Sequence, residues 1–370
     1  MTSPAIAGTG RDAVSATVSP DRRRLGSLLI RAATLLLAVL ILVQSLFAAE
    51  LIGFGFANWM PIFIAYVLWS AALCAGLIVR DGEAGWRALF VLPAVLFTVA
   101  LVIFPTFFGL FIAFSDWNLQ SAGGRTFNGL DNLYQLIHDE YFWNALINMV
   151  FYVATVLVQY AIAFGLALLL NADIKAQKFF RVAFLLPFML SPVAVSWMIG
   201  KSMLDYRYGP VSNFLRFIGW ENPNLLADER FVVFTIAAMD AWVWIPFMMI
   251  LILAGLQALP KEVQEAAKVD GATGWQGFWE ITFPLMLPVS VTTVVLRIIF
   301  QLKLADIVIN TTAGGPGGAS DTISSYIFRV YRDRSNVGYG TMVAEVYLII
   351  IIIFVALMLK FTSKYMQRDA

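Results

Sequence analysis

The 370-residue sequence has one cysteine, Cys74, and one histidine, His138. Cys74 lies inside an apolar run, so neither a disulfide framework nor a thiolate metal cluster is available. A membrane-embedded enzyme needs a nucleophile, an acid–base pair or a metal cluster near the membrane interface. The scarcity of both residue types makes such an enzyme the weakest of the functional alternatives.

Charged residues are also scarce, at 13% of the chain, whereas a typical globular domain carries about 25%. Hydrophobic residues make up 60% of the chain and the mean hydropathy is +0.78. These values exclude a soluble protein and indicate a lipid bilayer as the environment. The net charge is +1 and the basic residues are dispersed among loops, so we expect no nucleic-acid partner.

The sequence has no G-x-x-x-x-G-K-[ST] phosphate loop, so we expect this chain to bind no ATP itself. It also has no clear internal repeat. Ion-driven secondary transporters usually show inverted repeats with broken helices and midplane carboxylates. A secondary transporter therefore stays an alternative, separated by whether transport needs ATP hydrolysis or an ion gradient.

Long apolar runs are abundant, and each reaches the roughly 20 residues that span a bilayer core. They predict an all-α, polytopic membrane helix bundle with about eight transmembrane helices. We expect a disordered cytoplasmic tail at 1–27, two additional N-terminal helices at 28–87, and a six-helix core at 88–370. The predicted spans are Leu28–Ala49, Trp59–Val79, Ala88–Ser115, Ala145–Leu170, Val182–Met203, Phe231–Leu259, Pro284–Asp306 and Tyr339–Lys360.

The distribution of lysine and arginine predicts the orientation, because loops kept in the cytoplasm carry the excess. Most basic residues fall in the N-terminal tail, the turns after the second and fourth spans, the loop at 260–284 and the C-terminal tail. We therefore expect both termini and this loop to be cytoplasmic.

The loop itself is a polar segment, Glu265–Pro284, between two apolar runs. Its sequence predicts a first short helix and a left-handed turn at Gly271. Thr273 and Gln276 have the spacing of a capping box at the start of a second short helix, which we expect to stop at Pro284. Two short helices at an angle would make a compact docking surface.

Two stretches carry a family resemblance. The run Glu265-Ala266-Ala267, followed by Gly271 and then Ile281 and Pro284, resembles the EAA coupling loop of permease subunits in binding-protein-dependent ABC importers. It departs from the usual pattern at Phe283, where leucine is commoner. The run Gly314–Gly318, followed by Asp321, Thr322 and Tyr326, is similar to a loop of the carbohydrate-importing branch, the maltose and glycerol-phosphate permease type.

The resemblance covers roughly residues 90 to 370 and implies the type I permease fold of ABC importers, in a bacterial plasma (inner) membrane. It implies an ATP-binding cassette ATPase dimer that binds ATP and Mg, a second permease subunit, and an extracytoplasmic solute-binding protein. The chain would have no cofactor and no catalytic centre of its own, and would work by alternating access. The coupling residues that would lie in a cleft of the ATPase are Glu265, Ala266, Ala267 and Gly271.

Polar groups inside spans are expensive in hydrocarbon and usually face a cavity or pair with one another. A carboxylate and two aromatic rings lie at one-turn spacings before the loop, and a second stripe of polar and aromatic residues follows it. In maltose-type permeases the solute site is contributed by these two spans, which implies a site at Asp240, Trp244, Phe247, Phe300, Gln301 and Leu304. Arg297 either joins this site or pairs with Asp240 as a structural tie.

The charges also predict the class of solute. A carboxylate near a bound phosphate would oppose it by roughly 4 kcal/mol at an effective dielectric near 20, and an Arg297 that neutralises Asp240 would leave little attraction for an anion. We therefore expect a sugar, glycoside or polyol. The segment Asp116–Asn144 is too short for a folded insertion, so we expect the loop Gly314–Ser320 to supply much of the binding-protein docking surface.

Overall fold

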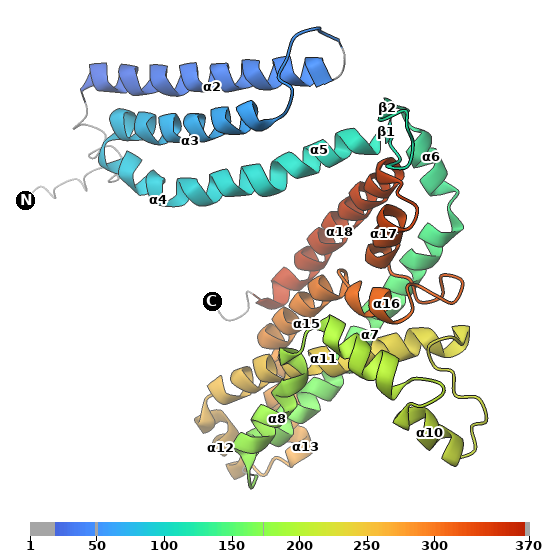
Figure 1. Ribbon diagram of the computed structural model, residues 1–370. Coiled ribbons are helices and arrows are strands. Elements are labelled where there is room, and N and C mark those ends of the chain that lie inside the picture. The colour runs from blue at the N-terminus through green and yellow to red at the C-terminus, as the bar shows by residue number, and fades with distance from the viewer. Residues whose placement is uncertain (1–18, 49–50, 173, 367–370) are drawn as a thin grey trace, which may run out of the picture. The chain divides into compact units, whose positions relative to one another are not determined.

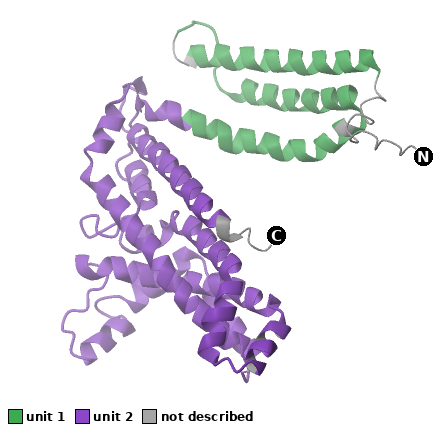
Figure 2. Ribbon diagram, turned by 180° about the vertical axis from the view of Figure 1, so that it is seen from behind, with its two compact units in different colours: residues 1–108 green, residues 109–370 purple. Residues whose placement is uncertain are grey.

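The computed structural model describes residues 19–48, 51–172 and 174–366 (Figure 1). The chain divides into two compact units, residues 1–108 and 109–370 (Figure 2). Residues 1–18 of the predicted tail lie outside the described residues. The first helix of the described residues, α2, begins at Pro20, ahead of the predicted start at Leu28. A proline suits the first turn of a helix, because no N–H donor is needed there.

Unit 1 is built from long apolar helices. In order, they are α2 (Pro20–Ala48), α3 (Met60–Asp81), α4 (Glu83–Thr98), the π-helical turn η1 (Val99–Ile103) and the first part of α5 (Phe104–Ala113). Helices α2 and α3 approach closely at two glycines, since a Cβ added to Gly26 would lie 2.6 Å from the carbonyl oxygen of Gly76. Small residues at a helix crossing allow the backbones to come into contact.

Two side-chain hydrogen bonds tie unit 1 together. Trp69 Nε1 on α3 donates to Thr34 Oγ1 on α2 at 3.0 Å. Tyr66 on α3 donates its hydroxyl to the carbonyl oxygen of Leu96 on α4 at 2.6 Å. The second bond joins α4 to the N-terminal helices. Unit 1 consequently extends past residue 87, where the sequence predicts the boundary of the two additional helices.

Unit 2 holds the remaining elements. They are the strands β1 (Ser115–Asp116) and β2 (Thr126–Phe127), then α6 (Asp131–Ile137), α7 (Glu140–Asn171), α8 (Gln177–Met189), α9 (Pro192–Val195), η2 (Ser196–Met203), α10 (Pro210–Phe217), α11 (Glu229–Ala258), α12 (Lys261–Val269), α13 (Gly274–Gln276), η3 (Gly277–Thr282), α14 (Phe283–Leu285), α15 (Leu287–Gln301), α16 (Asp306–Thr311), α17 (Ile323–Arg332) and α18 (Val337–Met366). Strands β1 and β2 pair antiparallel. Within this unit, β1, β2 and α6 lie at one end and α12 and α13 at the other (Figure 1).

In the described part of the chain six helices are long and apolar enough to cross a membrane, or eight spans if two bent pairs are each counted as one. The fifth predicted span bends by 93° between α8 and α9, and the seventh bends by 65° between Leu285 and Leu287. In the fifth, Leu190 and Ser191 are extended because Pro192 disfavours a helical residue before it. The continuous helices predicted there are therefore broken.

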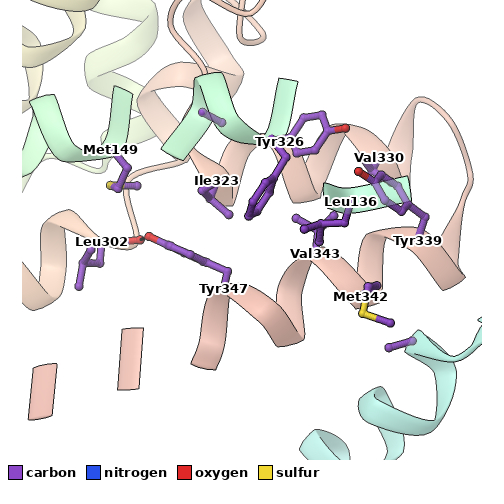
Figure 3. Packing of buried hydrophobic residues seen from close by; sticks show 13 residues of the cluster. Leu136, Met149, Leu302, Ile323, Tyr326, Val330, Tyr339, Met342, Val343 and Tyr347 are labelled. Atoms are coloured by element: carbon purple, nitrogen blue, oxygen red, sulfur yellow. Dashed lines mark hydrogen bonds between the residues drawn. The ribbon is translucent and has the colours of Figure 1, made fainter. Parts of the chain in front are cut away.

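The core at the β1–β2 end of unit 2 is a cluster of buried side chains from α6, α7, α17 and α18 (Figure 3). Tyr326, on α17, and Tyr339, on α18, both donate their hydroxyls to Asp139, the residue that caps α7. Tyr347 donates to the carbonyl oxygen of Leu302 at 2.7 Å. Each buried tyrosine thus has a partner for its hydroxyl, as a packed interior requires.

Candidate functional site

Three helices of unit 2 meet at a buried polar cluster. Asp240 lies on α11, Arg297 on α15 and Gln159 on α7, and each is at most 1% exposed. Arg297 Nη2 pairs with Asp240 Oδ2, so the ion pair that the sequence left open does form. Buried charges persist only when they are paired and hydrogen-bonded.

Gln159 is the residue of this cluster that the sequence analysis missed. Its Oε1 accepts a hydrogen bond from Arg297 Nε at 3.0 Å, and its Nε2 donates to Asp240 Oδ2 at 3.4 Å. One amide thus serves both charges, because it offers an acceptor to the cation and a donor to the anion. The sequence does show a glutamine inside an apolar span. Because a polar group in hydrocarbon is costly, such a residue is a candidate for a functional role.

Aromatic rings border the ion pair. Trp244, on α11, stacks on Phe300, on α15, with ring centroids 4.8 Å apart and planes at 25°. Phe247 meets Phe300 edge-on at 5.9 Å, and the guanidinium of Arg297 lies 4.9 Å from the centre of the Trp244 ring. Phe188, on α8, adds a ring 5.7 Å from Trp244, and the sequence analysis did not predict this contribution. The three predicted aromatic residues of the two spans, Trp244, Phe247 and Phe300, are therefore brought together.

Gln301 is the last residue of α15, and its amide lies close to the Asp240 carboxylate. It is completely buried, yet neither its Nε2 nor its Oε1 has a hydrogen bond in the described structure, and the same holds for Arg297 Nη1. A buried polar atom without a hydrogen bond costs about 1–3 kcal/mol, so a polar group that bonds these atoms would stabilise the site. These atoms offer two kinds of donor and one acceptor.

Leu304 lies beyond the end of α15, in an apolar cluster against which Trp244 also packs. Helix α15 ends at Gln301 and a turn follows, with the N–H of Leu304 donating to the carbonyl of Gln301 at 2.9 Å. Leu304 instead packs in an apolar cluster with Ile307 and Val308, and its carbonyl accepts from Thr322. The predicted stripe assumed that the helix continued to Asp306, but α16 begins there as a separate helix.

The polar segment between α11 and α15 has the local structure expected from its sequence. Helix α12 is followed by Gly271 with φ +78°, in the left-handed region. Thr273 and Gln276 form the predicted capping box, with the Gln276 N–H donating to Thr273 Oγ1 at 3.3 Å and the Thr273 N–H donating to Gln276 Oε1 at 3.0 Å. The second helix does not stop at Pro284, because the π-turn η3 leads into α14, which ends at Leu285.

This segment presents an exposed face. Glu265 and Ala266 are exposed, and Val269 is 87% exposed, which is unusual for an aliphatic side chain. Ala267 lines a cavity of about 620 Å³ that lies between the segment and the ends of α7 and α11. The exposed residues of α12 therefore leave this face accessible to a partner protein.

The glycine-rich loop lies against the start of α7. Asn144 Nδ2 donates to the carbonyl oxygen of Gly318 at 2.7 Å, and Asn148 Nδ2 donates to that of Ala319 at 2.9 Å. Gly314 has φ +85°, and a Cβ there would lie 2.1 Å from Asp321 Oδ1, so only glycine fits. Pro316 borders a polar hollow of about 470 Å³.

Asp321 follows this loop in the sequence and is held by an ion pair and a hydrogen bond. It is 1% exposed, pairs with Arg329 and accepts a hydrogen bond from Ser325 Oγ at 3.0 Å. Burial raises the pKa of the Asp321 carboxyl above its usual range, and the nearby Arg329 guanidinium opposes that rise. The loop is therefore a fixed structure and not a loose connection.

The fold and these three features define a polytopic membrane permease. The chain belongs to the family described as "Binding-protein-dependent transport system inner membrane component", whose model matches residues 161–366. Its role is that of the multi-pass, inner-membrane translocation subunit of an ATP-driven importer, and neither an enzyme nor an ion-coupled transporter fits that family. The sequence-based family prediction is confirmed.

Individual relatives agree with this assignment. The chain is 30% identical over 282 residues to the trehalose/maltose transport system permease protein MalF of Thermococcus litoralis, covering 76% of this chain and 94% of that one. It is 31% identical over 266 residues to the sulfoquinovosyl glycerol transport system permease protein SmoG of Agrobacterium fabrum, covering 72% and 86%. It is 30% identical over 285 residues to the sn-glycerol-3-phosphate transport system permease protein UgpA of the same organism, covering 75% and 94%.

A solved structure supports the fold alone. A chain of a bacterial alginate ABC transporter, crystallised with its alginate pentasaccharide-bound periplasmic protein, superposes with a TM-score of 0.66 at 22% identity. The match covers 78% of this chain and 98% of that chain. The all-α helix bundle predicted from the apolar runs and the permease fold implied by the family resemblance are thereby confirmed.

Proposed function

We propose that this chain is one of two different permease subunits of an importer for a neutral polyhydroxylated solute, a sugar, glycoside or polyol. The names of its relatives support the carbohydrate class, since they include a trehalose/maltose and a sulfoquinovosyl glycerol permease. Relatives also include a glycerol-phosphate permease, so homology leaves the charge of the solute open. The polar cluster is what favours a neutral solute.

The single observation that carries the proposal is the fully buried amide of Gln301, which lies near Asp240 and makes no well-formed hydrogen bond. It lies with the free Nη1 of Arg297 beside the stacked rings of Trp244 and Phe300. Aromatic faces pack on the C–H side of a sugar ring, while amide and guanidinium groups bond its hydroxyls. Asp240 offsets the charge of Arg297, which leaves little net attraction for a phosphate or sulfonate.

Gln159 acts in this site as a positioning residue. It holds Nε of Arg297, and Asp240 holds Nη2, so the guanidinium is fixed in a plane that leaves Nη1 for the solute. Each of these three partners comes from a different helix. A relative movement of the helices would therefore re-aim Arg297 and change the affinity of the site, as alternating access requires.

Energy coupling runs through α12 and the capped turn that follows it. Glu265, Ala266, Ala267 and Gly271 would dock in a cleft of an ATPase dimer, whose subunits bind ATP and Mg. The exposed face of this segment supports the assignment, as does its fixed geometry. This proposal puts the segment and both termini in the cytoplasm, in agreement with the charge distribution.

The opposite surface would receive the solute-binding protein. The loop Gly314–Ser320 supports this role because its hydrogen bonds to α7 fix its shape, and because Pro316 borders a polar hollow. Crosslinking from this loop should capture the binding protein in at least one state of the transport cycle. The absence of any crosslink in every state would contradict the docking proposal.

The solute assignment is tested by uptake into liposomes that contain the complete importer, with competing sugars, polyols and sugar phosphates. Gln301→Ala and Asp240→Ala should lower uptake at least tenfold and alter the order of competitors. Thr292→Ala is the matched control, because Thr292 is an exposed residue of the same helix α15 and bonds only the backbone of Pro288. A sugar phosphate as preferred cargo, or unchanged uptake in both variants, would refute the proposed site.

A further inference from the structure

A second cavity of unit 2 lies away from the site described above, between α8 and α11. Its volume is about 240 Å³, several times the roughly 30 Å³ that one water occupies. Arg181 and Leu185 of α8 line one side, and Ile250, Leu253 and Gln257 of α11 line the other. None of these residues belongs to the candidate solute site or to α12 and the capped turn that follows it, which we call the coupling segment.

The two helices run antiparallel along this cavity. Arg181 shares it with Gln257, whereas Phe188, two turns further along α8, contacts Trp244 and Phe247 on α11. Gln257 lies in the last turn of α11, directly before α12, and α8 begins at Gln177. The Arg181 end of the cavity is therefore at the membrane boundary, and the rest extends toward the bilayer interior.

Arg181 lacks a partner for its charge. Its Nε is buried without a hydrogen bond, and no acidic side chain of the described residues lies within ion-pair distance of it. Lys178, one turn earlier on α8, is exposed and adds a second positive charge nearby. A buried guanidinium nitrogen without a partner at a membrane boundary is complementary to an anion.

Apart from Gln257, the rest of the cavity lining is apolar, in contrast to the cationic end at Arg181. Leu185, Ile250 and Leu253 form an apolar wall deeper in the cavity, and Ile250 is 41% exposed, so this wall opens outward from the helix pair. A cationic and amide-bearing end followed by an apolar end matches one kind of molecule. We propose that this cavity is a binding site for an anionic phospholipid, with the phosphate at Arg181 and Gln257 and an acyl chain along Leu185 and Leu253.

The proposed site has a consequence for the transporter. Helix α8 carries Phe188 to the aromatic rings of the candidate solute site, so a headgroup bound at Arg181 fixes the end of a helix that also borders that site. Bilayers without anionic lipid would leave this end of α8 without its counter-charge.

The test is native mass spectrometry of the purified full chain with dioleoyl phosphatidylglycerol or dioleoyl phosphatidylcholine. One basic contact to an anionic headgroup predicts a preference for phosphatidylglycerol of about fivefold. Arg181→Gln should abolish this preference, whereas the matched control Lys178→Gln should keep it. Leu253→Trp, which fills the apolar end but leaves Arg181 in place, should also abolish retention and tests the site if Arg181→Gln does not fold.

Each contrary result has a definite meaning. Equal retention of the two lipids, or a preference that survives Arg181→Gln, overturns the proposal. An equal loss in Lys178→Gln assigns the effect to general surface charge, and displacement by inorganic phosphate at the same concentration assigns it to a simple anion site. Loss of retention when the second permease subunit is present assigns the cavity to the subunit interface, and this also overturns the lipid site.

Discussion

Two variants that remove the ion pair between Asp240 and Arg297 test whether the pair is only a structural tie or also part of a solute site. Asp240→Leu leaves Arg297 fully buried with only the 3.0 Å bond to Gln159. Breaking a buried pair in this way costs about 3–5 kcal/mol, because one charge stays uncompensated. We expect the single variant to lower the free energy of unfolding by that amount.

The double variant Asp240→Leu/Arg297→Met removes both charges and fills their space with apolar groups. Replacing a whole buried pair is often neutral or stabilising, so we expect the free energy of unfolding to return to within about 1 kcal/mol of the original value. Uptake of solute should nevertheless stay lost, because Arg297 Nη1 and the Asp240 carboxylate no longer line the site.

Two measurements decide the matter. The free energy of unfolding comes from titration with sodium dodecyl sulfate in mixed micelles, followed by the loss of helical circular dichroism, and uptake comes from the reconstituted importer. A double variant that regains full uptake would refute the solute site and leave a structural tie. A single variant that changes the free energy by less than about 1 kcal/mol would refute the reasoning on buried charge itself.

Three further changes test other parts of the chain. Gly271→Val places a branched residue at φ +78°, at a cost of about 1–3 kcal/mol, and should abolish ATP-driven uptake while membrane insertion persists; normal uptake would contradict the coupling role. Gly314→Ala puts a Cβ 2.1 Å from Asp321 Oδ1 and should speed amide hydrogen exchange in the glycine-rich loop, whereas unchanged exchange would argue against a fixed loop. Because burial raises the pKa of Asp321, the native state holds this proton more tightly than the unfolded chain, where the pKa is about 3.9. The contribution of this proton to the free energy of unfolding is fully present below the unfolded-state pKa. It is lost as the pH rises through the pKa of Asp321 in the folded state. Asp321→Asn should flatten this decline in the unfolding midpoint, and an unaltered decline would exclude Asp321 as its source.

The coupling segment is the part of the fold that the sequence predicts in most detail. Its signals are local: Thr273 and Gln276 satisfy each other's backbone groups within one turn, and Gly271 supplies a conformation that other residues resist. Such interactions do not depend on the rest of the chain. The π-turn η3 was missed because nothing in its composition separates it from an ordinary helix.

The bends in the fifth and seventh spans could not be read from composition. A broken apolar run and a straight one have the same hydropathy, and Pro187 lies inside α8 without ending it. The break falls instead at Leu190 and Ser191, directly before Pro192, which disfavours a helical conformation in the residue that precedes it. Leu304 was expected on the same helical stripe as Arg297 and Gln301, but α15 ends at Gln301 and Leu304 lies in the turn that follows.

The polar cluster depends on contacts between helices that the sequence of one helix does not predict. The sequence marked Asp240 and Arg297 as expensive groups that had to pair or face a cavity, and they pair. Gln159 carries the same kind of signal, but it lies in another span, and its distance to the ion pair depends on how α7 packs against α11 and α15. Spacing along one helix contains no information on that packing.

Helix α15 links the two ends of the proposed mechanism. It begins at Leu287, after a 65° bend from the helical turns that follow Gly271, and ends at Gln301. Those residues span roughly 20 Å at 1.5 Å per residue, so a tilt of about 5° at the bend would move Gln301 by roughly 2 Å. Arg297, ten residues along α15, would move by roughly 1.3 Å, and a shift of that size along its 3.0 Å bond to Gln159 would exceed hydrogen-bond distance. A short rigid helix therefore turns a small movement of the coupling segment into a changed set of hydrogen-bond partners at the solute site.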